Sequence, residues 1–233
     1  MATEPSDAAL IVFARLPVPG AVKTRLQPVI GPEACARLYE AFLRDALDQY
    51  AALGPAVRLY LAPAPEPVPP GLVPDGADVF TQQGADLGAR MLRAFVETFG
   101  AGYARAVVVG TDHPTLPDAF VEIAFEALDE PLSVCIGPSD DGGYYLLGMN
   151  ELYPQLFAGM TYSRPDVFDA TVARAAQTSA GLTVLPPWYD VDTPADLRRL
   201  LADLDETPPH TRRVLQELAG AHPELRSSHG PER

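Results

Sequence analysis

Residues 104–110 read ARAVVVG and lead directly into TDHP at 111–114. An apolar run of this length, ending at a Gly-Thr-Asp turn, is typical of a strand that is buried on both faces of its sheet. Such a strand needs helices on both sides, which is the arrangement of α/β proteins with a mainly parallel sheet. We therefore predict an α/β fold built around this strand.

The rest of the chain alternates apolar runs of strand length with amphipathic stretches of helical length, and this predicts a three-layer, Rossmann-like fold with a mainly parallel central sheet. Further strands are expected at 10–14, 56–61, 77–81, 132–137, 144–148 and 182–185, and helices at 32–53, 87–99, 117–128, 164–177 and 194–204. The proline-rich segment 62–76 is expected to be a surface loop. We expect a single domain over residues 1–206, then a short helix and a frayed tail over 207–233.

The composition excludes several classes of protein. The net charge of −14 disfavours nucleic acid as a general partner, because such binding requires basic side chains that neutralise phosphates. The N-terminus has no basic signal region, and no apolar run approaches the roughly 18 residues of a membrane span, so we expect a cytoplasmic protein. Cys35 and Cys135 are expected to be buried apolar side chains. Nothing in the sequence specifies an oligomeric state.

Ligands of such sheets bind beyond the carboxyl ends of the strands, so the segments that follow the strands are the candidate sites. The loop after the first strand contains Arg15, Gly20, Lys23 and Arg25 and no acidic residue. Forked arginine donors, a lysine point charge and the close backbone approach that glycine permits suit a phosphate group. The loop has neither a Walker A motif nor a dinucleotide glycine motif. The alternative is a solvated basic loop.

Two acidic segments could hold a divalent metal. Asp112 follows the central strand, where its carboxylate could bind Mg²⁺ or Mn²⁺ against a diphosphate, although a local turn that uses the same carboxylate is the alternative. The segment Thr193–Asp196 has the pattern of a capping box. This leaves Asp190 and Asp192 without a capping role, and either could supply a second metal ligand.

The segment PSDDGGYY over residues 138–145 combines two acids, two glycines and two tyrosines, and its candidate site residues are Asp140, Asp141, Gly142, Gly143 and Tyr144. A tight Asp-Gly hairpin turn explains one acid and one glycine but not the second of each. We interpret the segment as part of a sugar or acceptor pocket, with Asp140 or Asp141 as the general base if one is needed.

The segment QQGADLGARM over residues 82–91 opens a predicted helix. Asp86 has the position of an N-cap residue. Arg90 either faces a ligand or pairs with Asp86 one turn back. Both residues are candidates for the nucleotide site.

In their order along the chain, five motifs resemble those of the DUF2064 group of GT-A glycosyltransferase-like proteins, within the nucleotide-diphospho-sugar transferase superfamily. These are FARLPVPGxVKTRL, QxGADLGxRM, GTDHPTLP, DDGGYYLLG and DVDTPADL, and the resemblance covers roughly residues 9–203. Some members of this group are described as arsenosugar-biosynthesis glycosyltransferases. The chain is more distantly similar to nucleotidyltransferases of the MobA and phospholactate-guanylyltransferase kind, but its first loop lacks the LxGGxxxRMG motif of MobA.

The resemblance implies a GT-A fold, a Mg²⁺ or Mn²⁺ cofactor, and a nucleotide or nucleotide-sugar donor with a small-molecule acceptor. By the same resemblance the loop with Arg15, Lys23 and Arg25 binds phosphate, Asp112 binds the metal, and Asp192 or Asp190 is the second carboxylate near it. The implied activity is glycosyl transfer from a nucleoside-diphosphate sugar. The alternatives are nucleotidyl transfer from a nucleoside triphosphate with release of pyrophosphate, and a non-catalytic nucleotide-binding protein.

Overall fold

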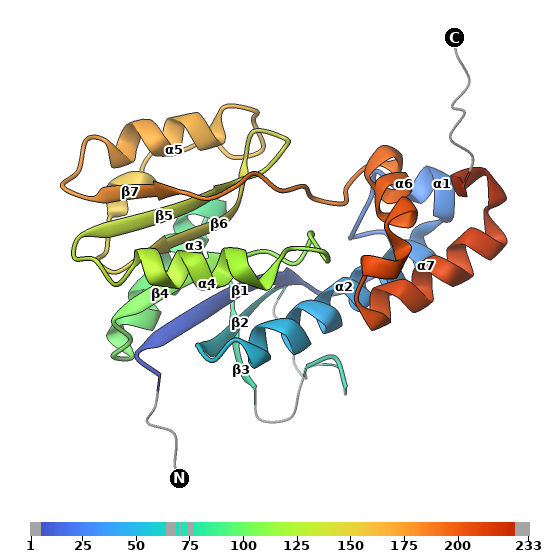
Figure 1. Ribbon diagram of the computed structural model, residues 1–233, viewed down its shortest axis with the longest axis horizontal. Coiled ribbons are helices and arrows are strands. Elements are labelled where there is room, and N and C mark those ends of the chain that lie inside the picture. Colours follow the sequence, from blue (N-terminus) through green and yellow to red (C-terminus); the bar gives the residue numbers. More distant parts are fainter. Residues whose placement is uncertain (1–5, 64–68, 70, 74–76, 227–233) are drawn as a thin grey trace.

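The computed structural model describes residues 6–63, 69, 71–73 and 77–226 (Figure 1). The frayed end predicted for the last residues falls on 227–233 and lies outside this range, as does most of the predicted proline-rich loop. The division into a domain up to residue 206 and a short C-terminal addition stays a prediction.

A seven-stranded sheet forms the centre of the fold, with the strand order β3-β2-β1-β4-β6-β5-β7. The strands are β1 (Ala8–Arg15), β2 (Ala56–Ala62), β3 (Asp78–Thr81), β4 (Arg105–Val109), β5 (Ser133–Pro138), β6 (Tyr144–Met149) and β7 (Gly181–Val184). All strands run in one direction except β6, which pairs antiparallel with both β4 and β5. The predicted α/β fold with a mainly parallel sheet is confirmed, and the VVV strand β4 lies in its middle.

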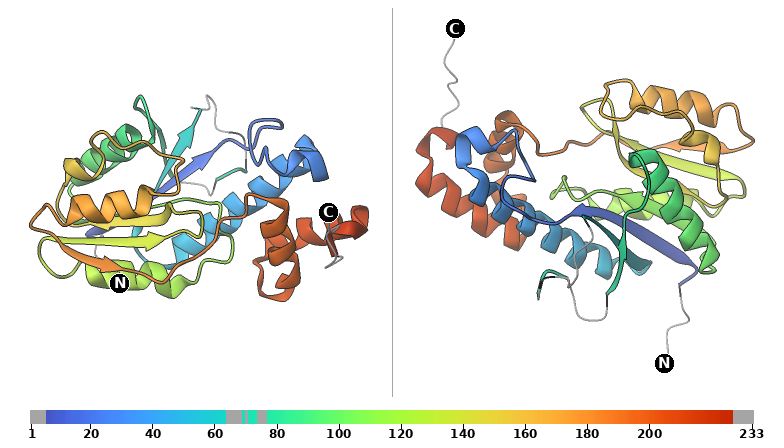
Figure 2. Two further views of the ribbon diagram at one scale, coloured as in Figure 1. Left: turned by 90° about the horizontal axis from the view of Figure 1, so that it is seen from above. Right: turned by 180° about the vertical axis from the view of Figure 1, so that it is seen from behind.

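Two layers of helices cover the sheet (Figures 1 and 2). Helices α2 (Pro32–Ala52) and α4 (Asp118–Ala127) pack on one face, against alternate side chains of β1 such as Leu10 and Val12. Helices α3 (Leu87–Gly100) and α5 (Val167–Ala175) lie on the opposite face, where Ile11 is buried. Burial on both faces explains why the central strands are continuously apolar rather than alternating.

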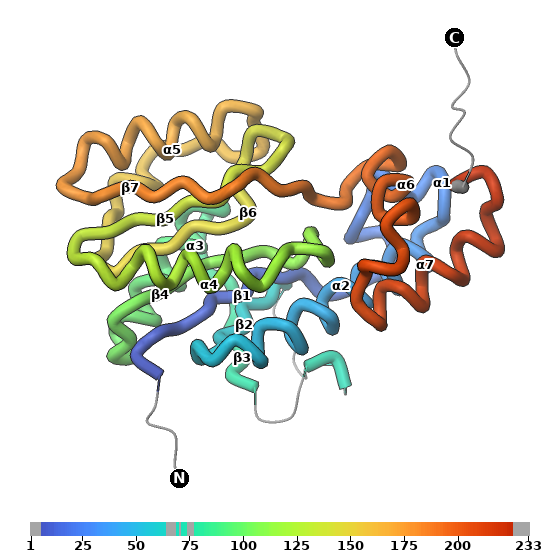
Figure 3. Tube along the Cα trace, viewed as in Figure 1, coloured from blue at the N-terminus to red at the C-terminus, as the bar shows by residue number. Residues whose placement is uncertain are grey.

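A second apolar cluster lies beside the sheet, where the first half of α2 extends past it. It gathers α1 (Gln27–Ile30), α6 (Pro194–Ala202), α7 (Pro209–Ala221) and the 3-10 turn η3 (Pro223–Arg226) around that half of α2. The buried carboxylate of Asp45 on α2 accepts hydrogen bonds from the backbone N–H groups of His210 (3.0 Å) and Thr211 (2.7 Å), which docks the start of α7. Figure 3 shows the segment after β7 crossing from the sheet to this helical lobe.

The boundaries of the elements differ from the sequence prediction at a few points. Helix α5 begins at Val167, three residues later than expected. The expected first residue, Arg164, precedes Pro165, and a residue before proline is disfavoured in the helical conformation. The four-residue helix α1 and the 3-10 turns η1 (Pro154–Leu156) and η2 (Leu204–Glu206) were not expected.

Both cysteines are fully buried and free, as predicted. Burial raises the pKa of the Cys135 thiol to about 12 and, against a smaller opposing effect of the Lys23 charge, that of Cys35 to about 11. Among the described residues, no helix is both long and apolar enough to cross a membrane.

Candidate functional site

The topology brings five predicted segments to one edge of the sheet. Strands β1, β3, β4, β5 and β7 run in the same direction, so the residues that follow each of them emerge at the same side. These followers are the basic loop after β1, the start of α3, the loop after β4, the turn after β5 and the segment after β7. This is the edge at which ligands of open α/β sheets bind.

At this edge the ammonium group of Lys23 lies between two carboxylates from distant parts of the chain. Lys23 Nζ forms an ion pair with Oδ1 of Asp112 and lies 3.1 Å from Oδ1 of Asp192. The lysine side chain is only 3% exposed, whereas those of Asp112 and Asp192 are 44% and 45% exposed. Burial alone would lower the pKa of Lys23, but the charges of Asp112 and Asp192 outweigh it and hold the pKa above its ordinary value.

Aromatic rings from α2 form the floor beneath this ammonium group. Lys23 Nζ lies 5.8 Å from the ring centre of Tyr39 and 5.5 Å from that of Phe42. The Tyr39 hydroxyl accepts a hydrogen bond from the backbone N–H of Arg15 (2.8 Å) and is 3.0 Å from Oγ1 of Thr111, and burial raises its pKa to about 12. Tyr39 therefore ties the end of β1 to the end of β4, directly beneath Lys23.

Asp190 lies beside this group and joins it to the turn after β5. Its Oδ2 accepts a hydrogen bond from the Ser139 hydroxyl, and its Oδ1 is 3.4 Å from Nδ1 of the buried His113. Burial alone would raise the pKa of Asp190, but the contacts with His113 and Ser139 and the charge of Lys23 lower it. The next residue, Val191, donates its N–H to the Asp112 carbonyl (2.8 Å), which fixes the two segments together.

The exposed part of the basic loop presents Arg15 and Arg25 to solvent. Gly20 forms a turn with a φ of 85°, a left-handed conformation that favours glycine. No carboxylate of the described residues pairs with either arginine. Their guanidinium groups are thus free for an anion, whereas Lys23 from the same loop is turned inward.

The DDGG segment is the connecting turn of the β5–β6 hairpin. The N–H of Ser139 donates to Gly143 O and that of Gly142 to Ser139 O, each at 3.0 Å, and Asp141 Oδ1 accepts from the Gly143 N–H at 2.9 Å. At Gly142 the φ is 88°, and a Cβ atom would stand 2.0 Å from the carbonyl oxygen of Pro165. The hairpin and this close approach therefore account for Gly142, and Asp141 is exposed.

Asp140 and Tyr144 each contact a side chain other than Asp112. Asp140 Oδ2 accepts from the guanidinium of Arg199 on α6 (3.1 Å), and that guanidinium lies 3.6 Å from the ring centre of Tyr189. The Tyr144 hydroxyl lies 3.8 Å from Sδ of Met91 on α3, and burial raises its pKa well above the ordinary value. The pocket role of these residues stays a prediction.

Asp86 and Arg90 stand at the start of α3. Asp86 is the N-cap, as the sequence predicted, and accepts a hydrogen bond from Ala89 N–H at 2.8 Å. Arg90 does not pair with Asp86 but donates through Nε to the carbonyl of Gly84 (3.2 Å). The predicted capping box of α6 is also present, with Thr193 and Asp196 bonded reciprocally.

Sequence reasoning missed several residues that shape this edge of the sheet, namely Tyr39, Phe42, Ser139 and Arg199. Ser139 stands next to a predicted acid, which could have drawn attention to it. Tyr39 and Phe42 sit in the apolar stripe of a helix, where nothing in the local pattern separates them from ordinary core residues.

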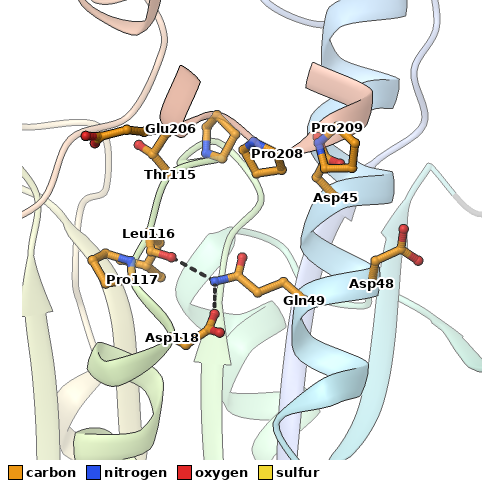
Figure 4. Close-up of a pocket in the computed structure, with 11 residues that line it drawn as sticks. Asp45, Asp48, Gln49, Thr115, Leu116, Pro117, Asp118, Glu206, Pro208 and Pro209 are labelled. Atoms are coloured by element: carbon orange, nitrogen blue, oxygen red, sulfur yellow. Dashed lines mark hydrogen bonds between the residues drawn. The ribbon is translucent and has the colours of Figure 1, made fainter. Parts of the chain in front are cut away.

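A cavity of about 370 Å³ opens behind the loop that follows β4 (Figure 4). Its walls come from α2, from Pro114–Asp118 and from the turn before α7, and they carry four carboxylates, those of Asp45, Asp48, Asp118 and Glu206, with no lysine or arginine. An anionic nucleotide would be repelled there. We therefore place the candidate site on the other side of this loop, at Asp112.

The donor chemistry at Asp112 and Asp192 fits a hard divalent cation. Two carboxylates that share a counter-charge and face solvent are what Mg²⁺ or Mn²⁺ uses when phosphate oxygens and water complete its shell. Within the described part of the chain, no cluster of three or more His, Cys, Asp or Glu side chains could hold a metal by itself. A metal here would therefore complete its shell with water or with oxygens of a bound ligand.

A family profile described as "Uncharacterized protein conserved in bacteria (DUF2064)" matches residues 35–164. The chain is 32% identical to a protein from Desulfovibrio desulfuricans G20 described as a candidate nucleotide-diphospho-sugar transferase. That match covers 94% of this chain and 98% of that chain, with a TM-score of 0.86. The search of curated proteins gave no match.

Two more distant structures share the fold alone. CMP:2-keto-3-deoxy-manno-octonic acid synthetase complexed with CTP is 13% identical, with coverage of 86% of this chain and 99% of that chain and a TM-score of 0.56. Rv0371c from Mycobacterium tuberculosis H37Rv, in complex with manganese, is 18% identical, with coverage of 85% and 100% and a TM-score of 0.53. The match to the Desulfovibrio protein extends over most of the chain, whereas the family profile leaves out the basic loop and residues 190–192.

Proposed function

The chain belongs to the DUF2064 family, and from this premise we propose that it is a metal-dependent glycosyltransferase that moves a sugar from a nucleoside-diphosphate sugar to a small acceptor. The observation that carries the proposal is the meeting of Asp112 and Asp192 at the carboxyl edge of the sheet, next to the exposed Arg15 and Arg25. A diphosphate leaving group needs such a combination of a cation site and free arginines. The likeness to the Desulfovibrio protein supports the same reaction class.

In this proposal Asp112 and Asp192 hold one Mg²⁺ or Mn²⁺. The bound cation would neutralise the charge that develops on the departing diphosphate. Arg15 and Arg25 bind the remaining phosphate oxygens through their forked N–H donors, and the turn at Gly20 lets the backbone approach them. The main catalytic effect is electrostatic stabilisation together with positioning of the acceptor.

The acceptor is deprotonated, in this proposal, by a carboxylate of the β5–β6 turn. Asp141 suits this role better than Asp140, because Asp140 forms an ion pair with Arg199 whereas Asp141, among the described residues, accepts a hydrogen bond only from a backbone N–H. The segment Gly142–Tyr144 would shape the acceptor pocket beside it. The start of α3 with Asp86 and Arg90 borders the donor. As part of the same proposal, we include an activity like that of the arsenosugar-biosynthesis glycosyltransferases that the sequence resembles.

The second candidate function is nucleotidyl transfer, in which a nucleoside monophosphate moves to a phosphorylated acceptor and pyrophosphate leaves. This alternative is supported by the fold that the chain shares with the synthetase complexed with CTP. One pair of carboxylates could serve either reaction. The absence of the MobA glycine-rich motif from the loop after β1 counts against it.

A ligand screen separates these functions. We would measure melting temperatures with UDP-, GDP-, ADP- and dTDP-sugars and with the four nucleoside triphosphates, each with and without Mn²⁺. A ligand at 100 times its Kd adds about 2.7 kcal/mol of stability. The expected result is a Mn²⁺-dependent rise with one diphosphate sugar, followed by release of free nucleoside diphosphate with an acceptor. A rise with a triphosphate only, with release of pyrophosphate, would select nucleotidyl transfer, and no rise at all would favour a non-catalytic protein.

A further inference from the structure

Lys23 contacts only one oxygen of each of the two carboxylates, those of Asp112 and Asp192. Its ammonium group contacts Oδ1 of Asp112 and Oδ1 of Asp192. Oδ2 of either residue makes no hydrogen bond to another residue in the described part of the chain. Both aspartate side chains are nearly half exposed while the lysine side chain is 3% exposed, so the ammonium group lies on the protein side and the carboxylates border the solvent.

The lysine is held in this inward position by its surroundings. The rings of Tyr39 and Phe42 flank the ammonium group, a favourable arrangement for a cation. The backbone at Lys23 has a φ of 47°, a left-handed conformation that a residue with a side chain adopts only when its surroundings impose it. Reaching out to a phosphate would require leaving this floor and exposing two mutually repelling carboxylates.

We propose that Lys23 is a positioning residue that holds Asp112 and Asp192 close together, so that one divalent cation can bind both through the oxygens that the lysine does not contact. This rests on the proposed function, in which the two carboxylates are the metal ligands. Two carboxylates at such short range repel each other, and an ammonium group behind them removes the repulsion before the metal arrives. The phosphate role that the resemblance implies for Lys23 then falls to Arg15 and Arg25.

The main competing scheme makes the opposite prediction. If the ammonium group occupies the place of the metal, the cation must displace it, and removing Lys23 should strengthen metal binding. If Lys23 positions the carboxylates from behind, removing it should weaken metal binding. The sign of the change in Mn²⁺ affinity therefore decides between the two schemes.

The test is titration of the whole protein with Mn²⁺ alone. Binding is measured by calorimetry and by the electron paramagnetic resonance signal of free Mn²⁺. Lys23→Met keeps an apolar side chain on the floor of Tyr39 and Phe42 but removes the charge. We expect it to weaken Mn²⁺ binding by about 10- to 100-fold, the range seen when a residue behind a metal ligand is removed. Arg198→Met, an exposed residue of α6, removes one positive charge near the site without touching the carboxylates and should leave Mn²⁺ affinity nearly unchanged.

The melting temperature of each metal-free variant shows whether it is folded. Should Lys23→Met not fold, Lys23→Gln keeps a neutral N–H donor for one carboxylate and should also bind Mn²⁺ more weakly. Unchanged or tighter binding by a folded Lys23 variant would overturn the positioning role while leaving the proposed function standing. If the wild-type protein itself binds no Mn²⁺, both the metal role in the proposed function and the role of Lys23 are wrong.

Discussion

The site contains two pairs of aspartates that differ in two respects: how far apart their members lie in the sequence, and which groups they contact. Asp112 and Asp192 are far apart in the chain, yet both meet the one buried ammonium group of Lys23. Asp140 and Asp141 are neighbours, yet one turns to an exposed arginine on α6 and the other to the backbone of its own turn. Both members of the first pair are held by one buried positive charge, whereas the second pair divides between an ion pair with α6 and the backbone of the hairpin turn.

This difference favours the first pair as the cation site of the proposed function. A structural aspartate is satisfied by its hydrogen bonds, as Asp45 is by two N–H groups of α7. Asp112 and Asp192 each keep an oxygen that Lys23 does not contact and are nevertheless held at a common point. Burying the ammonium group of Lys23 between the two carboxylates costs desolvation free energy. Sites that carry such a cost are often functional, and a bound cation would give this pair a function.

The largest expected effect comes from neutralising a member of the first pair. Asp112→Asn or Asp192→Asn should weaken Mn²⁺ binding by at least about 100-fold, because loss of a ligand should exceed the effect of losing a residue behind it. Turnover should be lost with it, while the melting temperature changes little because the other aspartate still neutralises Lys23. Asp141→Asn is the matched control and should bind Mn²⁺ as the wild type does. Equal losses in both pairs, measured by calorimetry, would contradict the comparison.

The position of this edge could be predicted from the sequence, but its internal contacts could not. Five motifs that follow apolar strands predicted a common edge, because the carboxyl ends of parallel strands meet there. The partner of Lys23 is set by the packing of α1, α6 and α7 against α2, which places residue 23 next to residue 192. No periodicity within either segment encodes that contact.

The second acidic pair shows which features can be predicted from local sequence patterns. The Asp-Gly turn was an open alternative for residues 138–145, and the hairpin and the close approach of Gly142 to Pro165 now account for Gly142. What the sequence did not specify was β6 running antiparallel between β4 and β5, because an apolar run has no direction. The helix caps at Asp86 and Thr193, which depend on neighbouring residues alone, were predicted correctly.

Asp190 links the two pairs, and the pH dependence of stability tests this link. Its pKa in the folded protein is lowered, so its contribution to stability is complete above the unfolded pKa of about 3.9 and is lost as the pH falls through the folded pKa. With EDTA present, Asp190→Asn should reduce the free energy of unfolding by about 1–3 kcal/mol at pH 7, since a charged hydrogen-bond acceptor for Ser139 and His113 is lost.

Urea unfolding at pH 7, 5 and 3 measures this effect. The difference between wild type and Asp190→Asn should be smaller at pH 3 than at pH 5, because the stabilisation from a carboxyl with a lowered folded pKa is lost as the pH falls. Glu217→Gln on the exposed face of α7 is the control and should differ little from wild type at each pH. A difference that grows between pH 5 and pH 3 would mean that Asp190 does not stabilise the fold as a carboxylate, and the link between the pairs would be lost.

The smallest expected effect concerns the contact that anchors Asp140. Its partner Arg199 is 51% exposed and Asp140 is 55% exposed, so the ion pair should contribute less than about 1 kcal/mol. Arg199→Met also loses the cation–π contact with Tyr189, whereas Asp140→Asn keeps it, so the arginine variant should be the less stable of the two. A double-mutant cycle in urea, built from these two changes, isolates the coupling energy of the ion pair. A coupling energy of about 2 kcal/mol or more would mean that the Asp140–Arg199 ion pair holds the hairpin strongly. The contrast drawn between the Asp112/Asp192 pair and the Asp140/Asp141 pair would then fail.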